Sequence, residues 1–121
     1  MPSKDPALRF EDILENIERI ETHTAGMDRE TFAADKRTAD AVERCLSRIS
    51  EAAVKLGVQA ERSCPAIPWR DIRSLGNRLR HEYTAVDVAR IWLIVERDMA
   101  SLKEACQATV QRIRHKGGAQ S

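Results

Sequence analysis

The fold class is decided by residues 32–56, which read FAADKRTADAVERCLSRISEAAVKL and contain neither glycine nor proline. Apolar residues recur there every three or four positions, which is the spacing of one face of an α-helix; they are Phe32, Ala39, Val42, Leu46, Ile49, Ala53 and Leu56. Asp28 is suited to cap the start of this helix, and Gly57 is suited to end it. We therefore predict one long helix between these two residues.

The same pattern predicts three more helices. The first runs from about Ala7 to His23 and has an apolar stripe at Phe10, Ile13, Leu14, Ile17 and Ile20. The third follows Pro68, a residue that fits the first turn of a helix, and covers Trp69 to about Tyr83. The fourth follows a cap at Asp87 and carries Val88, Ile91, Val95, Met99, Leu102, Cys106 and Ile113.

Strand-type alternation is absent from the sequence, and residues 27–56 and 77–116 hold no glycine or proline. The prediction is an all-α fold, an antiparallel bundle of four main helices over residues 1–114, with a flexible tail at residues 115–121. The second and fourth helices are long for so small a chain, and we expect their apolar stripes to continue into a second copy as a homodimer.

Composition narrows the possible functions. The chain has 121 residues, enough for one domain, and its 20 Lys and Arg nearly balance its 19 Asp and Glu. It lacks an apolar stretch long enough for a membrane span or a secretory signal, so we expect a cytoplasmic protein without membrane contacts. Cys45, Cys64 and Cys106 have no metal-ligand spacing, which disfavours zinc or a disulfide framework.

Residues 69–83, WRDIRSLGNRLRHEY, are the stretch best suited to chemistry. On a helical wheel, Asn77, Arg70, Arg78 and Arg73 lie within roughly 80° of His81. Arginines bind phosphate, and a histidine can move the proton of a ribose 2′-hydroxyl, so this face suits phosphodiester cleavage. No carboxylate cluster accompanies it, so the predicted reaction needs neither metal nor cofactor. The alternative is that the arginines form only a solvated or interface surface.

Three ordered segments resemble the HepT-like toxins of the HEPN superfamily. They are residues 32–53 (FAAD, TADAVER and SEAA), residues 67–72 (IPWRDI) and residues 77–83 (NRLRHEY), and the likeness extends over about residues 8–105. The resemblance implies a dimeric helical bundle with a ribonuclease site, acting on RNA, at or near the dimer interface. It also implies a type II toxin–antitoxin system in which the antitoxin partner is a minimal nucleotidyltransferase.

The family motif, R-x(4–6)-H-x-Y, places roles on this sequence residue by residue. His81 matches the catalytic histidine, Tyr83 matches the tyrosine that the antitoxin modifies with AMP, and Asn77 matches the polar residue that follows the arginine. Gly76 stands where the catalytic arginine is expected. Arg73 and Arg78 are left as auxiliary phosphate contacts.

Gly76 allows three explanations at this point. The copy is inactive by degeneration, or the glycine is an inactivating change selected or introduced because the active protein is toxic, or Arg73 reaches the phosphate instead. A non-catalytic helical module that binds the nucleotidyltransferase is the alternative function, since such a module would not need the arginine.

Overall fold

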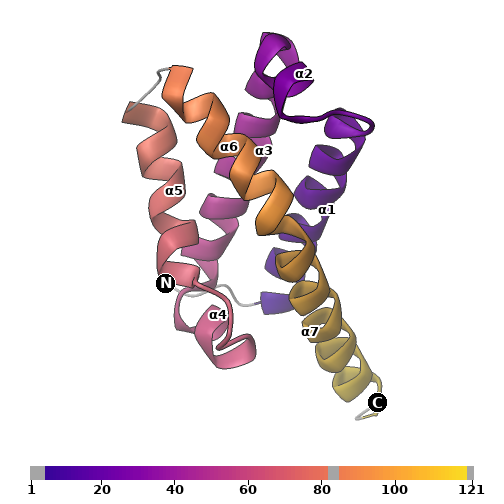
Figure 1. Cartoon of the computed structure of the whole chain (residues 1–121). Coiled ribbons are helices and arrows are strands. Elements are labelled where there is room, and N and C mark those ends of the chain that lie inside the picture. The colour runs from indigo at the N-terminus through magenta and orange to yellow at the C-terminus, as the bar shows by residue number, and fades with distance from the viewer. Residues whose placement is uncertain (1–4, 82–84, 120–121) are drawn as a thin grey trace.

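The computed structural model describes residues 5–81 and 85–119, and the regular elements within these residues are all helices (Figure 1). They are α1 (Pro6–Thr24), α2 (Arg29–Ala34), α3 (Lys36–Leu56), α4 (Val58–Ser63), α5 (Trp69–His81), α6 (Ala85–Arg97) and α7 (Met99–Ala119). The all-α prediction is confirmed. The second and fourth predicted helices are each divided in two, and the segment after Gly57, expected to be a connection, forms the short helix α4.

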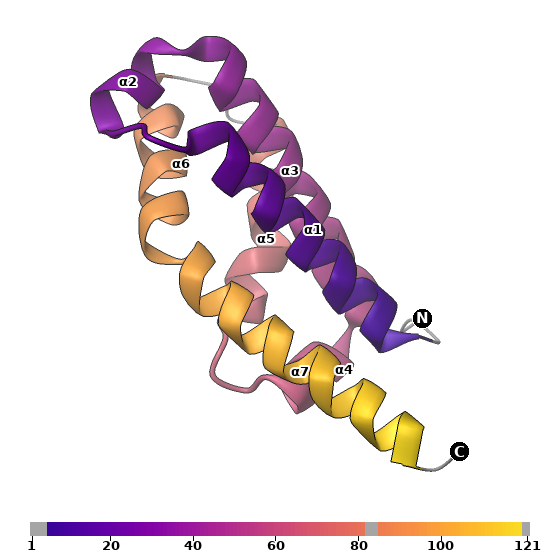
Figure 2. The ribbon, with the colours of Figure 1, turned by 90° about the vertical axis from the view of Figure 1, so that its right-hand side faces the viewer.

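Helix α3 is the central element of the bundle. It packs against α1 on one side and α5 on the other, and both of these neighbours run antiparallel to α3 (Figures 1 and 2). Helix α7 packs on α1, and α6 contacts α2, α3 and α7. In the described part of the chain, no helix is both long and apolar enough to cross a membrane.

The predicted second helix is interrupted at Asp35. Its start is as expected, because the Asp28 carboxylate accepts a hydrogen bond of 2.8 Å from the backbone N–H of Thr31. The Asp35 carboxylate, however, accepts bonds from the N–H and the hydroxyl of Thr38 at 3.0 and 2.8 Å, and so caps a new helix, α3. The expected end at Gly57 is confirmed, with φ at +57°.

The predicted fourth helix is also divided, at Asp98, where α6 bends into α7 (Figure 2). Helical hydrogen bonds continue through the bend, because the Asp98 N–H donates to the Ile94 carbonyl oxygen and the Leu102 N–H donates to the Asp98 carbonyl oxygen. Helix α6 begins at Ala85, two residues before the cap expected at Asp87, and α7 continues to Ala119 through most of the predicted tail. No proline follows residue 68, so nothing in the backbone forces an earlier end.

The apolar stripes form the core as the periodicity predicts. Phe10, Ile13, Ile17 and Ile20 of α1 are fully buried against α3, whose own stripe is buried along its whole length. All three cysteines are buried and free, and they fill the core as small apolar side chains. The short connection after α4 then delivers the chain to α5, the helix that carries the predicted site.

Candidate functional site

Helix α5 is fixed to the bundle through one apolar face. Trp69, Leu75 and Leu79 are buried, and the indole N–H of Trp69 donates a bond of 2.9 Å to the Cys64 carbonyl oxygen. The Trp69 ring also meets the Phe10 ring edge to face, with centroids 6.2 Å apart. These contacts set the N-terminal end of α5, so the opposite face of the helix is directed to solvent.

The solvent face of α5 carries polar side chains. Among the described residues, Arg70, Asp71, Ser74, Asn77 and Arg78 are all exposed. His81 is the last residue of α5, one helical turn after Asn77, but its side chain lies outside the described part of the structure. Tyr83 lies outside the described residues as well. The roles expected for these two residues therefore stay predictions, as do those of Asn77 and Arg78, which lie at the surface of α5.

Arg73 is directed away from this face and toward the junction of α3 and α4. Its guanidinium donates to the carbonyl oxygens of Ala53 and Gly57 at 3.3 and 2.8 Å, and it grips the Glu61 carboxylate in a bidentate pair at 2.9 and 2.5 Å. The hydrogen bonds from Arg73 hold the pKa of Glu61 below its usual range. A phosphate contact would require this guanidinium to leave the C-terminal end of α3, which it neutralises.

Gly76 faces α3 and is buried. Its N–H donates to the Ser50 hydroxyl at 3.1 Å, and that hydroxyl donates to the Arg73 carbonyl oxygen at 2.9 Å. A Cβ atom on Gly76 would lie 2.6 Å from the Ser50 Oγ and 3.0 Å from its Cβ. The three explanations of Gly76 drawn from the sequence consider only the missing arginine, whereas the structure shows that packing against Ser50 favours a glycine at this position. Sequence reasoning missed this contact, although Ser50 is a small polar residue within the buried stripe of α3 and could have indicated a close approach of another helix.

A cleft of about 670 Å³ separates α5 from α6 and α7. Its apolar lining includes Leu75 and Leu102, and its charged lining consists of Arg78, Arg90 and Arg97 together with Asp71 and Asp98. All three arginines are exposed. Arg90 and Arg97 were missed from the sequence, although their spacing of seven places them on one helix face. The cleft therefore brings arginines from two helices beside the solvent face of α5.

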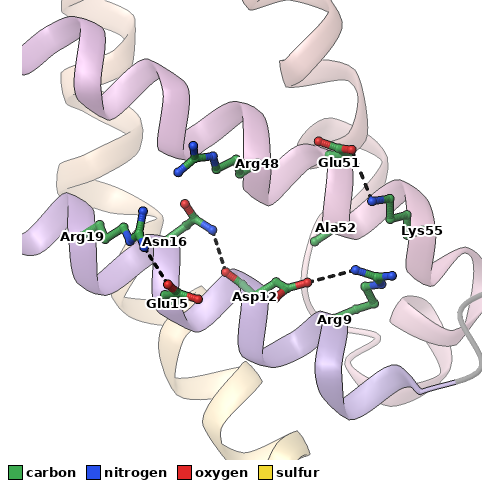
Figure 3. A pocket seen from close by; sticks show the side chains of 9 residues that line it. All are labelled: Arg9, Asp12, Glu15, Asn16, Arg19, Arg48, Glu51, Ala52 and Lys55. Atoms are coloured by element: carbon green, nitrogen blue, oxygen red, sulfur yellow. Dashed lines mark hydrogen bonds and ion pairs between the residues drawn. The ribbon is translucent and has the colours of Figure 1, made fainter.

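A second pocket, of about 240 Å³, lies between α1 and α3 (Figure 3). Its charged side chains largely neutralise one another in the ion pairs Arg9–Asp12, Arg19–Glu15 and Lys55–Glu51, with N–O distances of 3.1, 2.8 and 3.3 Å. Asn16 is also buried there and donates to the Asp12 carbonyl oxygen at 2.8 Å. Since most of these charges are paired, with Arg48 as the exception, this pocket is a weaker candidate for binding an anion than the α5 face.

No grouping of three or more potential metal-ligating side chains is present among the residues that the structure describes. The described α5 face presents guanidinium, hydroxyl and amide groups, together with the single exposed carboxylate of Asp71. Guanidinium, hydroxyl and amide groups bind and orient phosphate and sugar rather than a metal ion.

Comparison with known proteins decides the family. A family model described as "Ribonuclease HepT-like" matches residues 13–109. The chain belongs to the HepT-like ribonuclease family. "Probable ribonuclease HepT" of Thermococcus cleftensis is 42% identical over 94 residues, which are 78% of this chain and 86% of that protein. "Putative RNase MJ1216" of Methanocaldococcus jannaschii is 29% identical over 116 residues, 96% of each chain. No solved structure gives a significant match.

The match confirms the resemblance inferred from the sequence and covers the whole of α3 and α5, the two helices that build the candidate site. The relatives are named as ribonucleases, which agrees with a surface suited to phosphodiester chemistry.

Proposed function

We propose that this HepT-like protein is the toxin of a type II toxin–antitoxin system, a metal-independent endoribonuclease. The observation that carries the proposal is the solvent face of α5, where Asn77 and Arg78 are exposed on the helix that ends at His81. This helix lies within the segment that matches the HepT-like family.

In the proposed reaction, His81 takes the proton from a ribose 2′-hydroxyl while that oxygen attacks the adjacent phosphorus. The bond to the 5′-oxygen breaks, and the leaving oxygen takes up a proton from water. Asn77 orients the sugar or the imidazole, and Arg78 stabilises the negative charge that develops on the phosphoryl oxygens. Position 76 adds no side chain to this reaction, so the guanidinium must come from elsewhere on the surface.

Regulation is proposed to act through Tyr83, two residues after His81. An AMP group placed there by a nucleotidyltransferase antitoxin would add negative charge beside the arginines and repel the phosphates of RNA. We also propose that the protein acts as a cytoplasmic homodimer. The partly buried Ile72 and Ile94, which line the cleft beside α5, support an interface at this surface, because exposed apolar surface favours association.

The proposal is tested by RNA cleavage with the purified protein in EDTA, using wild type, His81→Ala, Asn77→Ala and Arg78→Ala. Cleavage by wild type is expected, with loss in His81→Ala and a decrease of about tenfold or more in the other two variants. Arg62→Ala is the matched control, because Arg62 is an exposed arginine on α4. Cleavage that Arg62→Ala reduces as strongly as Arg78→Ala does would contradict the assignment.

A folded wild type that cleaves none of a panel of RNAs would instead favour the non-catalytic module. Co-expression with the nucleotidyltransferase, followed by mass spectrometry, tests the regulatory part. An AMP adduct is expected on wild type and not on Tyr83→Phe.

A further inference from the structure

The contact between α3 and α5 is closest at Ser50 and Gly76. Ser50 is only 3% exposed, and its hydroxyl accepts from the Gly76 N–H at 3.1 Å while donating to the Arg73 carbonyl oxygen at 2.9 Å. Because a Cβ on residue 76 would approach Oγ of Ser50 to 2.6 Å, no other residue fits here without movement. The hydroxyl and the glycine are therefore complementary in shape as well as in hydrogen bonding.

A rotation of the Ser50 side chain would not make room for a larger residue at position 76. The rotation would break two hydrogen bonds in a buried place, which is unfavourable. It would also leave the Ser50 Cβ only 3.0 Å from the added atom, tighter than ordinary van der Waals contact. A side chain at position 76 must consequently push α5 away from α3.

Arg73 fixes the same turn of α5 from its other side. While its carbonyl oxygen accepts from Ser50, its guanidinium binds the carbonyl groups of Ala53 and Gly57 at the end of α3. The turn between Arg73 and Gly76 is thus attached to α3 through both backbone and side chain. Since Asn77 and Arg78 follow directly, this attachment sets which way they face.

We propose that Ser50 and Gly76 are a matched pair that sets the distance and rotation of α5 on α3, and that Ser50 is a positioning residue for the RNA face of α5. The second part rests on the proposed ribonuclease function. Gly76 is then a packing residue, directed at α3 rather than at RNA. An arginine introduced there would displace α5 instead of restoring a phosphate contact.

Thermal unfolding of single and double variants tests the pairing. Gly76→Ala is expected to lower the melting temperature by about 5 to 10 °C through overpacking. Ser50→Gly is expected to lower it by a few degrees, because glycine weakens a helix interior. The double variant Ser50→Gly/Gly76→Ala should melt no lower than Ser50→Gly alone, since the removed side chain makes room for the added methyl group.

Ser47→Gly is the matched control, because Ser47 lies in the same helix and is not in the contact with Gly76. The double variant Ser47→Gly/Gly76→Ala should lower the melting temperature by the sum of the decreases in the two single variants. If the decreases are equally additive in Ser50→Gly/Gly76→Ala, the two residues are not a pair and the proposal is overturned.

The positioning role is tested with Ser50→Ala, which keeps the Cβ and removes only the hydroxyl. Measured well below the melting temperature, its kcat for RNA cleavage should decrease about tenfold with little change in KM, because misplaced groups slow the chemical step. Ser47→Ala should retain the wild-type kcat. Gly76→Arg should remain at or below wild-type activity.

Three outcomes would count against the proposal in different ways. An unchanged kcat in Ser50→Ala would overturn the positioning role, and stronger cleavage by Gly76→Arg would overturn the packing assignment. An inactive wild type would overturn the ribonuclease function and the positioning role with it. In that case the melting temperatures alone would still decide whether Ser50 and Gly76 are paired.

Discussion

Replacing Arg73 by alanine separates a role in the fold from a role in RNA binding. The side chain is 25% exposed and donates to two carbonyl oxygens, of Ala53 and Gly57, at 3.3 and 2.8 Å. A hydrogen bond from a charged group contributes roughly 1.5 to 3 kcal/mol, and the 3.3 Å bond is long. We expect Arg73→Ala to lower the free energy of unfolding by about 2 to 3 kcal/mol, measured by urea denaturation.

Two further variants show which of the contacts of Arg73 matter. Arg73→Lys keeps the charge but cannot reach both carbonyl groups and the carboxylate in one planar geometry, so an intermediate loss is expected. Glu61→Gln should cause a smaller loss than Arg73→Ala, because Glu61 is half-exposed and solvent screens the pair.

The ion pair also predicts a dependence on pH. Because Arg73 lowers the pKa of Glu61 from its ordinary value of 4.5, the pair stabilises the fold above that pH. This contribution is lost as the pH decreases through the lowered pKa and the carboxylate is protonated. The loss of stability on acidification should therefore be smaller in Glu61→Gln than in wild type.

Measurements of RNA binding test the alternative role of Arg73, a contact with phosphate. If Arg73 stabilises the fold and does not bind RNA, the affinity for RNA, measured far below the melting temperature, should change little in Arg73→Ala. The affinity of Glu61→Gln for RNA should also change little. A variant that melts like wild type but binds RNA more weakly would refute the structural role. It would support the auxiliary phosphate contact expected from the sequence instead.

Three other predictions concern the cleft, the thiols and the core. Replacing Arg90 and Arg97 by alanine should weaken RNA binding and reduce the slope of log affinity against log salt by roughly 0.7 for each phosphate that the protein no longer neutralises; an unchanged slope would remove both from the RNA surface. Burial raises the pKa of Cys106 to about 12, so a thiol reagent at a pH of about 8 should label it only after unfolding, and rapid labelling of the native protein would contradict its burial. Trp69→Phe should lower the free energy of unfolding by about 2 kcal/mol in urea, because it removes the bond to the Cys64 carbonyl oxygen and leaves space in the core.

Much of the fold is contained in the order of residues along the chain. The spacing of apolar residues shows which side of each helix is buried, because burial repeats with the helical period. The stripe from Phe32 to Leu56 is buried in the structure as that spacing predicts, and Gly57 ends the helix. The break at Asp35 was missed, because an aspartate on the polar face of a helix and an aspartate that caps a new helix look alike in sequence.

For the candidate site, too, the sequence determined one part and the tertiary structure the other. The sequence by itself determined the helix that carries Asn77, Arg78 and His81 and the family to which the chain belongs. Only the tertiary structure decided what Gly76 and Arg73 contact, because Ser50 is 26 residues from one and Glu61 is 12 residues from the other. Helical periodicity specifies the direction of a side chain from its own axis. It does not specify which group on the neighbouring helix lies opposite, since that depends on how the two helices pack.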